Sequence, residues 1–425
     1  MQISIVNGRI VDPANSADVN DDLHIANGKV HSIGPKPAGF DAERVIDASG
    51  LVVCPGLVDL CARLREPGLE QKATIASESL AAVANGITTL CMPPDTTPVV
   101  DTPAVAELIH RRAQQAGLAR VEVVGALTQG LGGEHLAEMG ALSEAGCVGV
   151  GNAEQPVKNT EIMRRAMEYA ATFDLTVFSR AEDPWLAVGR DMHEGAVSTR
   201  LGLSGIPVTA ETIALNRDLA LAEQTGARTH FLHLSSARAV DLVREAKQRG
   251  LPVSADVTAH HVHLTEEELD GFNSECHLRP PLRSTADRDG LRAGLHDGTI
   301  NALCSSHQPH ERDARLNPFS ATDPGASGLD TLLPLALELV RQEVLSLSQA
   351  IQSLTHRPAT ILGVDRGHLR VGGVADVCVF DPKREWTLST ETMVSQGENT
   401  PLRGWTLIGR NRFTLVSGDI VFEDA

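Results

Sequence analysis

The sequence has few aromatic residues and lacks the features of secreted and membrane proteins. Only 3% of its residues are aromatic, and its three tryptophans, Trp185, Trp386 and Trp405, are too few and too separated to form a stacking platform for bases. Seven scattered cysteines with no Cys-x-x-Cys pair fit a reducing compartment. No apolar run approaches the roughly 18 residues of a membrane-spanning helix, and no basic segment precedes an apolar one at the N-terminus. We therefore expect a soluble, cytoplasmic protein without a membrane partner.

Positive charge is also scarce. The formal net charge is −18 at pH 7, with 37 Lys and Arg against 55 Asp and Glu. A chain of this charge repels phosphates instead of neutralising them, so we expect no nucleic-acid partner. A basic protein partner remains compatible with it. Hydrophobic residues at 42% and charged residues at 22% are near the globular average, so most of the chain should be folded.

The two ends of the chain share a pattern of short alternating strands. Near the N-terminus, apolar strands flank the pairs Asn7-Gly8 and Asn27-Gly28, which are typical of β-hairpin turns. Segments 375–381 and 413–422 have the same alternation near the C-terminus. We expect residues 1–54 and 364–425 to form one small β-sandwich module.

Between these ends, short apolar runs alternate with helical stretches. The apolar runs are residues 86–92, 121–126, 147–150, 175–178, 229–234, 253–257 and 300–304, and the helical candidates include 102–115, 160–172, 209–224 and 237–249. Strands separated by helices of this length predict a parallel sheet, and about eight of them predict a (β/α)8 barrel, here over residues 55–363. Functional groups of such barrels lie at the C-terminal ends of the strands.

The segment 55–68 reads Pro-Gly-Leu-Val-Asp-Leu-Cys-Ala-Arg-Leu-Arg-Glu-Pro-Gly and resembles the signature of dihydroorotases. Further matches follow in order at 88–98, 179–183, 230–236, 256–261, 279–283, 306–310, 328–331 and 399–401. Allantoinases and hydantoinases share this series more loosely. The resemblance covers the length of the chain and implies a TIM-type amidohydrolase barrel.

The same resemblance implies a set of metal ligands, and most of them are replaced here. Dihydroorotases carry a His-x-His pair, a bridging acidic group, two further histidines and an aspartate after the last strand. The matching positions in this chain are Cys61, Arg63, Asn152, Ala153, Arg180 and Ser306, and only His233 is retained. Activating a water molecule for cyclic-amide chemistry needs a metal such as zinc. We therefore expect zinc and catalysis to be absent.

Two of the replacements are cations. A guanidinium is charged at physiological pH and cannot coordinate a metal, so Arg63 and Arg180 would repel zinc. We hypothesise that they supply part of the missing positive charge and pair with carboxylates. The candidate partners are Glu182, Asp183 and Asp256.

Residues matching the substrate pocket of the family are partly altered. Arg65 is kept, the Asn of the Met-Pro loop is Pro94 or Asp95, and a second Asn is Arg279; His307 and His310 lie in the last matching motif. An Arg-lined cavity of this kind could hold a carboxylate ligand.

The remaining histidines and cysteines have a structural interpretation beside the functional one. His230 and His233 are expected to be hydrogen-bonded groups at a strand end, and Cys61 to be a buried apolar side chain. The functional alternatives are a reactive Cys61 thiolate near two arginines, and a metal site among His260, His261, His307 and His310.

The leading functional prediction is a non-catalytic dihydroorotase homologue. Some bacteria keep an inactive dihydroorotase-like chain that assembles with the catalytic chain of aspartate transcarbamoylase, and the resemblance implies six copies of each. One alternative is an active cyclic amidohydrolase with a rebuilt mononuclear site from Cys61, His233, His260 or His307. Another is a sensor that binds an anionic pyrimidine precursor at Arg65 and Arg279. No motif for an interface is recognisable.

Overall fold

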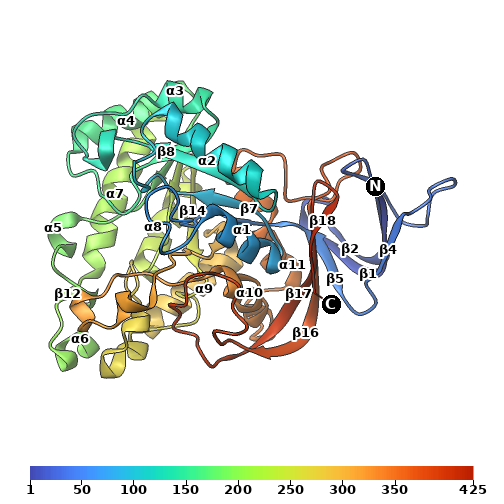
Figure 1. Cartoon of the computed structure of the whole chain (residues 1–425). Helices are drawn as coiled ribbons and strands as arrows, with labels where there is room; N and C mark the ends of the chain where they lie inside the picture. The colour runs from blue at the N-terminus through green and yellow to red at the C-terminus, as the bar shows by residue number, and fades with distance from the viewer. Residues whose placement is uncertain (425) are drawn as a thin grey trace.

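The computed structural model describes residues 1–424 and has two parts, a barrel ringed by helices and a separate sheet beside it (Figure 1). Both termini lie at the sheet, because the N- and C-terminal segments both contribute strands to it. Within the described residues, no helix combines the length and the apolar character that crossing a membrane demands.

The barrel consists of eight parallel strands in sequence order. They are β6 (Leu57–Asp59), β7 (Ile87–Met92), β8 (Arg120–Ala126), β9 (Cys147–Gly151), β10 (Thr176–Ser179), β13 (Thr229–Phe231), β14 (Val253–Thr258) and β15 (Ala302–Cys304). The ring closes just after β6 and β15, where Ala62 pairs with His307 in a parallel bridge. The backbone N–H of Arg63 donates to the carbonyl of His307 at 2.9 Å. The expected (β/α)8 barrel is therefore confirmed.

Helices cover the outside of the barrel. The longer ones are α1 (Ile75–Ala84), α2 (Pro103–Ala116), α4 (Thr160–Thr172), α7 (Val208–Thr225), α8 (Ala237–Gln248), α9 (Thr285–Asp297) and α10 (Leu332–Arg341). Shorter elements are α3 (Met139–Glu144), α5 (Pro184–Ala187), α6 (Ala196–Leu201), α11 (Leu347–Leu354), α12 (His356–Leu362) and the strand pair β11 (Met192–His193) and β12 (Gly205–Ile206). The helices expected at 102–115, 160–172, 209–224 and 237–249 all form within one residue of their predicted bounds.

Residues from both ends of the chain build the separate sheet. Its strands are β1 (Gln2–Asp12), β2 (Ala17–Ala26), β3 (Lys29–Ile33), β4 (Arg44–Asp47), β5 (Val52–Pro55), β16 (Val377–Thr387), β17 (Thr406–Val416) and β18 (Asp419–Glu423). The order is β18-β17-β16-β5-β1-β2-β3, with β4 paired to β1. The sheet has its own core, in which Ile3, Ile10 and Leu23 from the N-terminal segment pack with Val377 and Leu415 from the C-terminal one.

One of the two expected hairpin turns is wrong. Asn27-Gly28 turns the chain between the antiparallel strands β2 and β3, with positive φ at both residues. Asn7-Gly8 instead lies inside β1, where the pairing with β2 shifts register between Ile5 and Gly8. Asn7 has φ of 62°, so the pair forms a β-bulge that bends one strand. An Asn with positive φ before Gly occurs in β-bulges as well as in hairpin turns, and the sequence alone did not distinguish the two.

Candidate functional site

The site predicted from the family motifs lies at the C-terminal ends of the barrel strands. Arg63 follows β6, Arg180 follows β10 and His233 follows β13. Parallel strands place all these ends at one mouth of the barrel, which is where functional groups of such barrels lie. Residues that are more than 100 positions apart in sequence therefore share one buried centre.

Arg63 lies buried in this centre between two carboxylates. Its Nε donates to Asp95 Oδ2 at 2.7 Å, and its Nη2 donates to Glu154 Oε1 at 3.1 Å. The Arg63 side chain is 5% exposed, against 24% for Asp95 and 22% for Glu154. The guanidinium thus turns away from bulk solvent and is neutralised from two sides.

Arg180 continues the same row of charges. Its Nη1 forms an ion pair with Glu154 Oε2, and its Nη2 lies 3.0 Å from Glu182 Oε2. Arg279 bonds the other Glu182 oxygen, with Nη2 at 3.1 Å from Oε1. Burial acts to raise the pKa of Glu182, but the charges of Arg180 and Arg279 outweigh it and hold that pKa below its usual value.

These contacts form one unbroken chain of alternating charge. In order it comprises Asp95, Arg63, Glu154, Arg180, Glu182 and Arg279, hereafter the ion-pair chain. Three arginines and three carboxylates balance one another. A buried charge is stable only when it is paired in this way, since an unpaired one costs several kcal/mol or more.

The partners of the arginines only partly match the sequence-based hypothesis. Glu182 is a partner as expected. Asp183 is not, because it caps α5 by accepting from the backbone N–H groups of Trp185 and Leu186 at 3.0 Å. Asp256 is not either, because its carboxylate accepts from His230 Nε2 at 3.0 Å and from the backbone N–H of His233 at 2.6 Å.

The other replaced ligand positions take no part in the ion-pair chain, and they are Asn152, Ala153, Ser306 and Cys61. The Asn152 amide accepts from Thr128 Oγ1 at 2.8 Å and donates to two loop carbonyls, so it holds the loop after β9. Ala153 follows it with φ of 49°, and Ser306 likewise has a positive φ of 47°. Cys61 is buried, and burial raises the pKa of its thiol to about 12 although Arg63 acts to lower it. The reactive-thiolate alternative is not supported.

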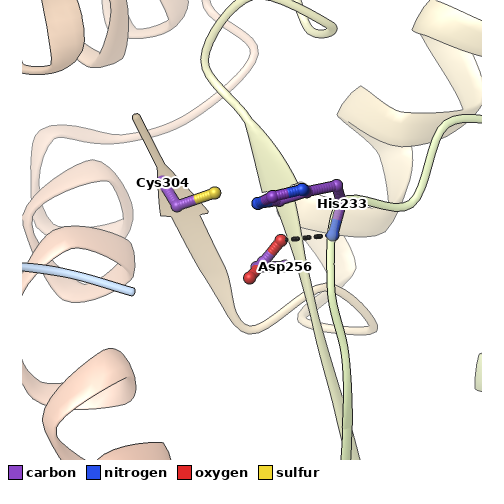
Figure 2. A group of neighbouring side chains, drawn as sticks. All are labelled: His233, Asp256 and Cys304. Carbon is purple, nitrogen blue, oxygen red and sulfur yellow. Dashed lines mark hydrogen bonds between the residues drawn. The ribbon is translucent and has the colours of Figure 1, made fainter. Parts of the chain in front are cut away.

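His233 is the retained family ligand, and its ring is unusual. Neither ring nitrogen has a hydrogen-bond partner among residues 1–424, although the side chain is buried. Burial, reinforced by Arg180 and Arg63, lowers the pKa of His233 to about 4, so the imidazole is neutral. Figure 2 shows the ring pointing toward Asp256 and Cys304, and ligand atoms of the three residues lie within 4.8 Å of one another.

This group is a poor match for the zinc centre that the fold family implies. Its three donors equal the number of protein ligands in a catalytic zinc site, where water takes the fourth position, but two of the three are not free to bind a metal. Both oxygens of Asp256 already accept hydrogen bonds, and burial raises the pKa of the Cys304 thiol well above its ordinary value. The cations Arg63 and Arg180 act on the same ring. His260 and His307 do not join His233 in any group of three potential ligands within residues 1–424.

His307 has a structural role. The backbone N–H of Gly328 donates to its Nδ1 at 3.1 Å, so its Nε2 carries the proton and donates to Glu78 Oε2 at 2.8 Å. Glu78 also accepts from Ser395 and from the backbone of Gln396. His307 therefore ties the end of the barrel to α1 and to the segment after β16, and both of its nitrogens are occupied.

Arg65 and His310 lie together, apart from the ion-pair chain. Arg65 Nε donates to the carbonyl of Pro309 at 3.0 Å, and its Nη2 lies 3.2 Å from His310 Nε2. Lys72 Nζ donates to His310 Nδ1 at 3.0 Å. Burial, with the charges of Arg65 and Lys72, lowers the pKa of His310 to about 3, so its ring is neutral.

Little free volume remains around the centre. Cavities that contact Cys61, Arg180 or His233 have volumes of about 10 to 20 Å³. That is about the space of a single water molecule, whereas pockets for small molecules measure about 300–1,000 Å³. The cavities in contact with these three residues are therefore too small for a small-molecule ligand.

Known proteins resemble this chain along its whole length. It is 51% identical to the "Dihydroorotase-like protein" of Pseudomonas aeruginosa over 100% of both chains, and 50% identical to that of Pseudomonas putida over 99% of both. It is 44% identical to the "Dihydroorotase" of Geobacter sp. strain M21, again over 100% of both chains.

A family model described as dihydro-orotase-like matches residues 50–239. Among solved structures, the L-hydantoinase of Arthrobacter aurescens superposes with a TM-score of 0.89 at 24% identity, covering 99% of this chain and 96% of the other. At that identity the superposition supports the fold alone. Together with the identity to relatives over the full chain, the fold and the motif series show that the chain belongs to the dihydroorotase-like family of the amidohydrolase superfamily.

Proposed function

We propose that this chain is a non-catalytic dihydroorotase homologue that serves as a structural or regulatory subunit of aspartate transcarbamoylase in pyrimidine biosynthesis. The observation that carries the proposal is the carboxylate of Glu154, which is shared by Arg63 and Arg180. The two guanidiniums stand at positions where dihydroorotases carry histidine ligands. Their charge and bulk oppose both a metal ion and a substrate.

The chemistry of the family supports this assignment. A bound zinc ion supplies a nucleophilic water by lowering its pKa to about 7. The residues in this centre offer no comparable activation. The cavity that His233 lines measures only about 10 Å³, and the pKa of the Cys61 thiol is about 12, so the thiol keeps its proton at neutral pH. The fold is kept while the parts that the reaction needs are replaced, so a role through a partner is favoured.

The experiment that tests the partner assignment is affinity purification from native cells. The chain, tagged at one terminus, is purified at low and at moderate salt, and the eluate is assayed for aspartate transcarbamoylase activity. We expect the transferase to co-purify, and light scattering to give the mass of six copies of each chain. A chain that elutes alone, with the transferase fully active in cells that lack it, contradicts the proposal.

One alternative has an observation in its favour. His233, Asp256 and Cys304 converge and could form a mononuclear metal site. The composition of this site differs from the one expected from the sequence, which drew on Cys61, His233, His260 or His307. A metal bound there would support an active cyclic amidohydrolase. The paired state of Arg63 and Arg180 argues against it. Metal content measured together with turnover separates the two functions.

A further inference from the structure

A basic region lies at the opposite end of the barrel from the ion-pair chain, whose charges balance. There a pocket of about 490 Å³ opens between the N-terminal ends of β9, β10, β13 and β14 and the helices α11 and α12. Its volume is within the range of small-molecule sites. Its polar lining includes Arg228, Ser254, Asn301, Gln352, His356 and Arg357.

Arg357 is the key residue of this pocket. Unlike the arginines of the ion-pair chain, it forms no ion pair and no side-chain hydrogen bond with any residue between 1 and 424. Burial lowers the pKa of Arg357, and no neighbouring carboxylate raises that pKa again. A half-buried guanidinium without a counter-charge is costly, and an anionic ligand would remove that cost.

The other charges around the pocket have the same sign. No Asp or Glu is among the described residues that line it. Arg228 pairs with Asp174, but that carboxylate is 85% exposed and neutralises little. Lys247 lies next to the pocket and donates to Asn301 Oδ1 at 2.7 Å. The Asn301 Oδ1 is thereby occupied, so the amide presents its N–H groups. Burial lowers the pKa of Lys247, the charge of Arg357 lowers it further, and Asp297, outside the pocket lining, only partly opposes them.

A groove of equal size on the same molecule provides a contrast. It also measures about 490 Å³ and lies between α2, β8 and the C-terminal strands. Its lining contains Glu122 and Asp419, and its Arg120 pairs with Asp376 at 3.3 Å. In a chain of net charge −18, the pocket at Arg357 is therefore distinct because it concentrates positive charge without carboxylates.

We propose that the pocket at Arg357 binds a phosphorylated small molecule that carries a flat aromatic ring, such as a nucleoside monophosphate. The phosphate would be held by Arg357, with His356 and Arg228 beside it. The apolar wall of Leu251, Ile361 and Leu362 would take the ring. This inference does not depend on the proposed subunit role, because the pocket is at the other end of the barrel from the ion-pair chain.

The test is calorimetric titration of the full chain with three probes: inorganic phosphate, ribose 5-phosphate and AMP. We expect AMP to bind at least about tenfold more tightly than inorganic phosphate, a difference of about 1.4 kcal/mol. The substitution Arg357→Gln should abolish AMP binding. The matched control is Arg111→Gln, because Arg111 is exposed on α2, outside the pocket, and this substitution should leave binding unchanged.

A second variant keeps the proposal testable if Arg357→Gln fails to fold. Gln352→Glu introduces a carboxylate into the lining at a partly exposed position of α11, and it should weaken AMP binding about tenfold or more through charge repulsion alone. The proposal is overturned if the native chain binds none of the three probes at millimolar concentration. It is also overturned if Arg357→Gln and Gln352→Glu, or whichever of the two folds, bind AMP as tightly as the native chain.

Discussion

Arg63 and Arg180 bond to opposite oxygens of a single carboxylate, that of Glu154. Two like charges are thus held side by side in a buried centre, which is stable only because the shared anion lies between them. In dihydroorotases the corresponding positions carry metal-binding histidines. We infer that Arg63 and Arg180 supply the positive charge that a metal ion would bring to this centre.

Removing the charge of Glu154 should therefore destabilise the fold strongly. In Glu154→Gln the two guanidiniums lose their common counter-ion and repel one another, and we expect the free energy of unfolding to fall by about 3 kcal/mol. Urea denaturation measures this change. The matched control is Glu161→Gln, since Glu161 also pairs with two arginines, Arg164 and Arg165, but is exposed on α4.

The control should lose much less stability, because solvent screens exposed ion pairs. Equal losses in the two variants would mean that the position of Glu154 between two buried guanidiniums has no special effect on stability. In that case the ion-pair chain would not be the element that replaces the metal centre.

The thiols offer a second check on the closed centre. All seven cysteines are buried, and burial raises the pKa of the Cys61 thiol to about 12. We expect no reaction of the folded chain with a thiol-specific disulfide reagent at pH 8, and reaction of seven thiols after unfolding in guanidinium. Rapid modification of Cys61 in the folded chain would instead indicate an open pocket with a thiolate.

If the chain were a sensor of an anionic pyrimidine precursor, ligand binding should stabilise it, whereas we expect no such effect. Arg65 and Arg279 would need free guanidiniums to hold an anionic precursor, yet Arg65 donates to Pro309 and approaches His310, and Arg279 pairs with Glu182. We expect carbamoyl aspartate, dihydroorotate and orotate to leave the melting temperature unchanged. A ligand-dependent increase that disappears in Arg65→Ala would favour the sensor.

Stability should fall in acid through partly buried, neutral histidines such as His263. Burial lowers the pKa of His263 from 6.5 to about 4, and its Nε2 lies 2.9 Å from the carbonyl of Leu335. Between these two pH values the unfolded chain binds a proton that the folded chain does not, so the free energy of unfolding decreases as pH falls. One such histidine contributes about 1.4 kcal/mol per pH unit, or about 2 kcal/mol from pH 6.5 to 5.

Chemical denaturation at several pH values, compared between the native chain and His263→Gln, measures this contribution. The variant should show a shallower loss between pH 6.5 and 5, whereas His135→Gln, at an exposed position, should behave like the native chain. Parallel pH profiles for the native chain and His263→Gln would show that folding does not lower the pKa of His263.

The sequence was sufficient for the barrel because the signals that define it are local. The helix at 160–172 formed with its predicted bounds, since Asn159 caps its first turn and its apolar side chains recur at helical spacing. The ligand positions could be located because they lie in ordered motifs. The ion pair between Arg180 and Glu182 could also be predicted, since the two residues are only two positions apart at the end of one strand.

The remaining contacts depend on which distant strand ends meet. Glu154 was visible in the sequence next to Asn152 and Ala153, but its role needs β6, β9 and β10 to converge, so that Arg63 and Arg180 reach it from two sides. Asp95 reaches Arg63 from the loop after β7 in the same way. No spacing pattern in the sequence predicts contacts of this kind between distant residues.

We infer that the ion-pair chain has replaced the metal-dependent chemistry of the family. Dihydroorotate formation by the purified chain can be measured after incubation with zinc, with bound metal quantified in the same sample. We expect no turnover and well below one zinc ion per chain. One equivalent of zinc, with turnover that is lost in His233→Ala, would contradict this inference.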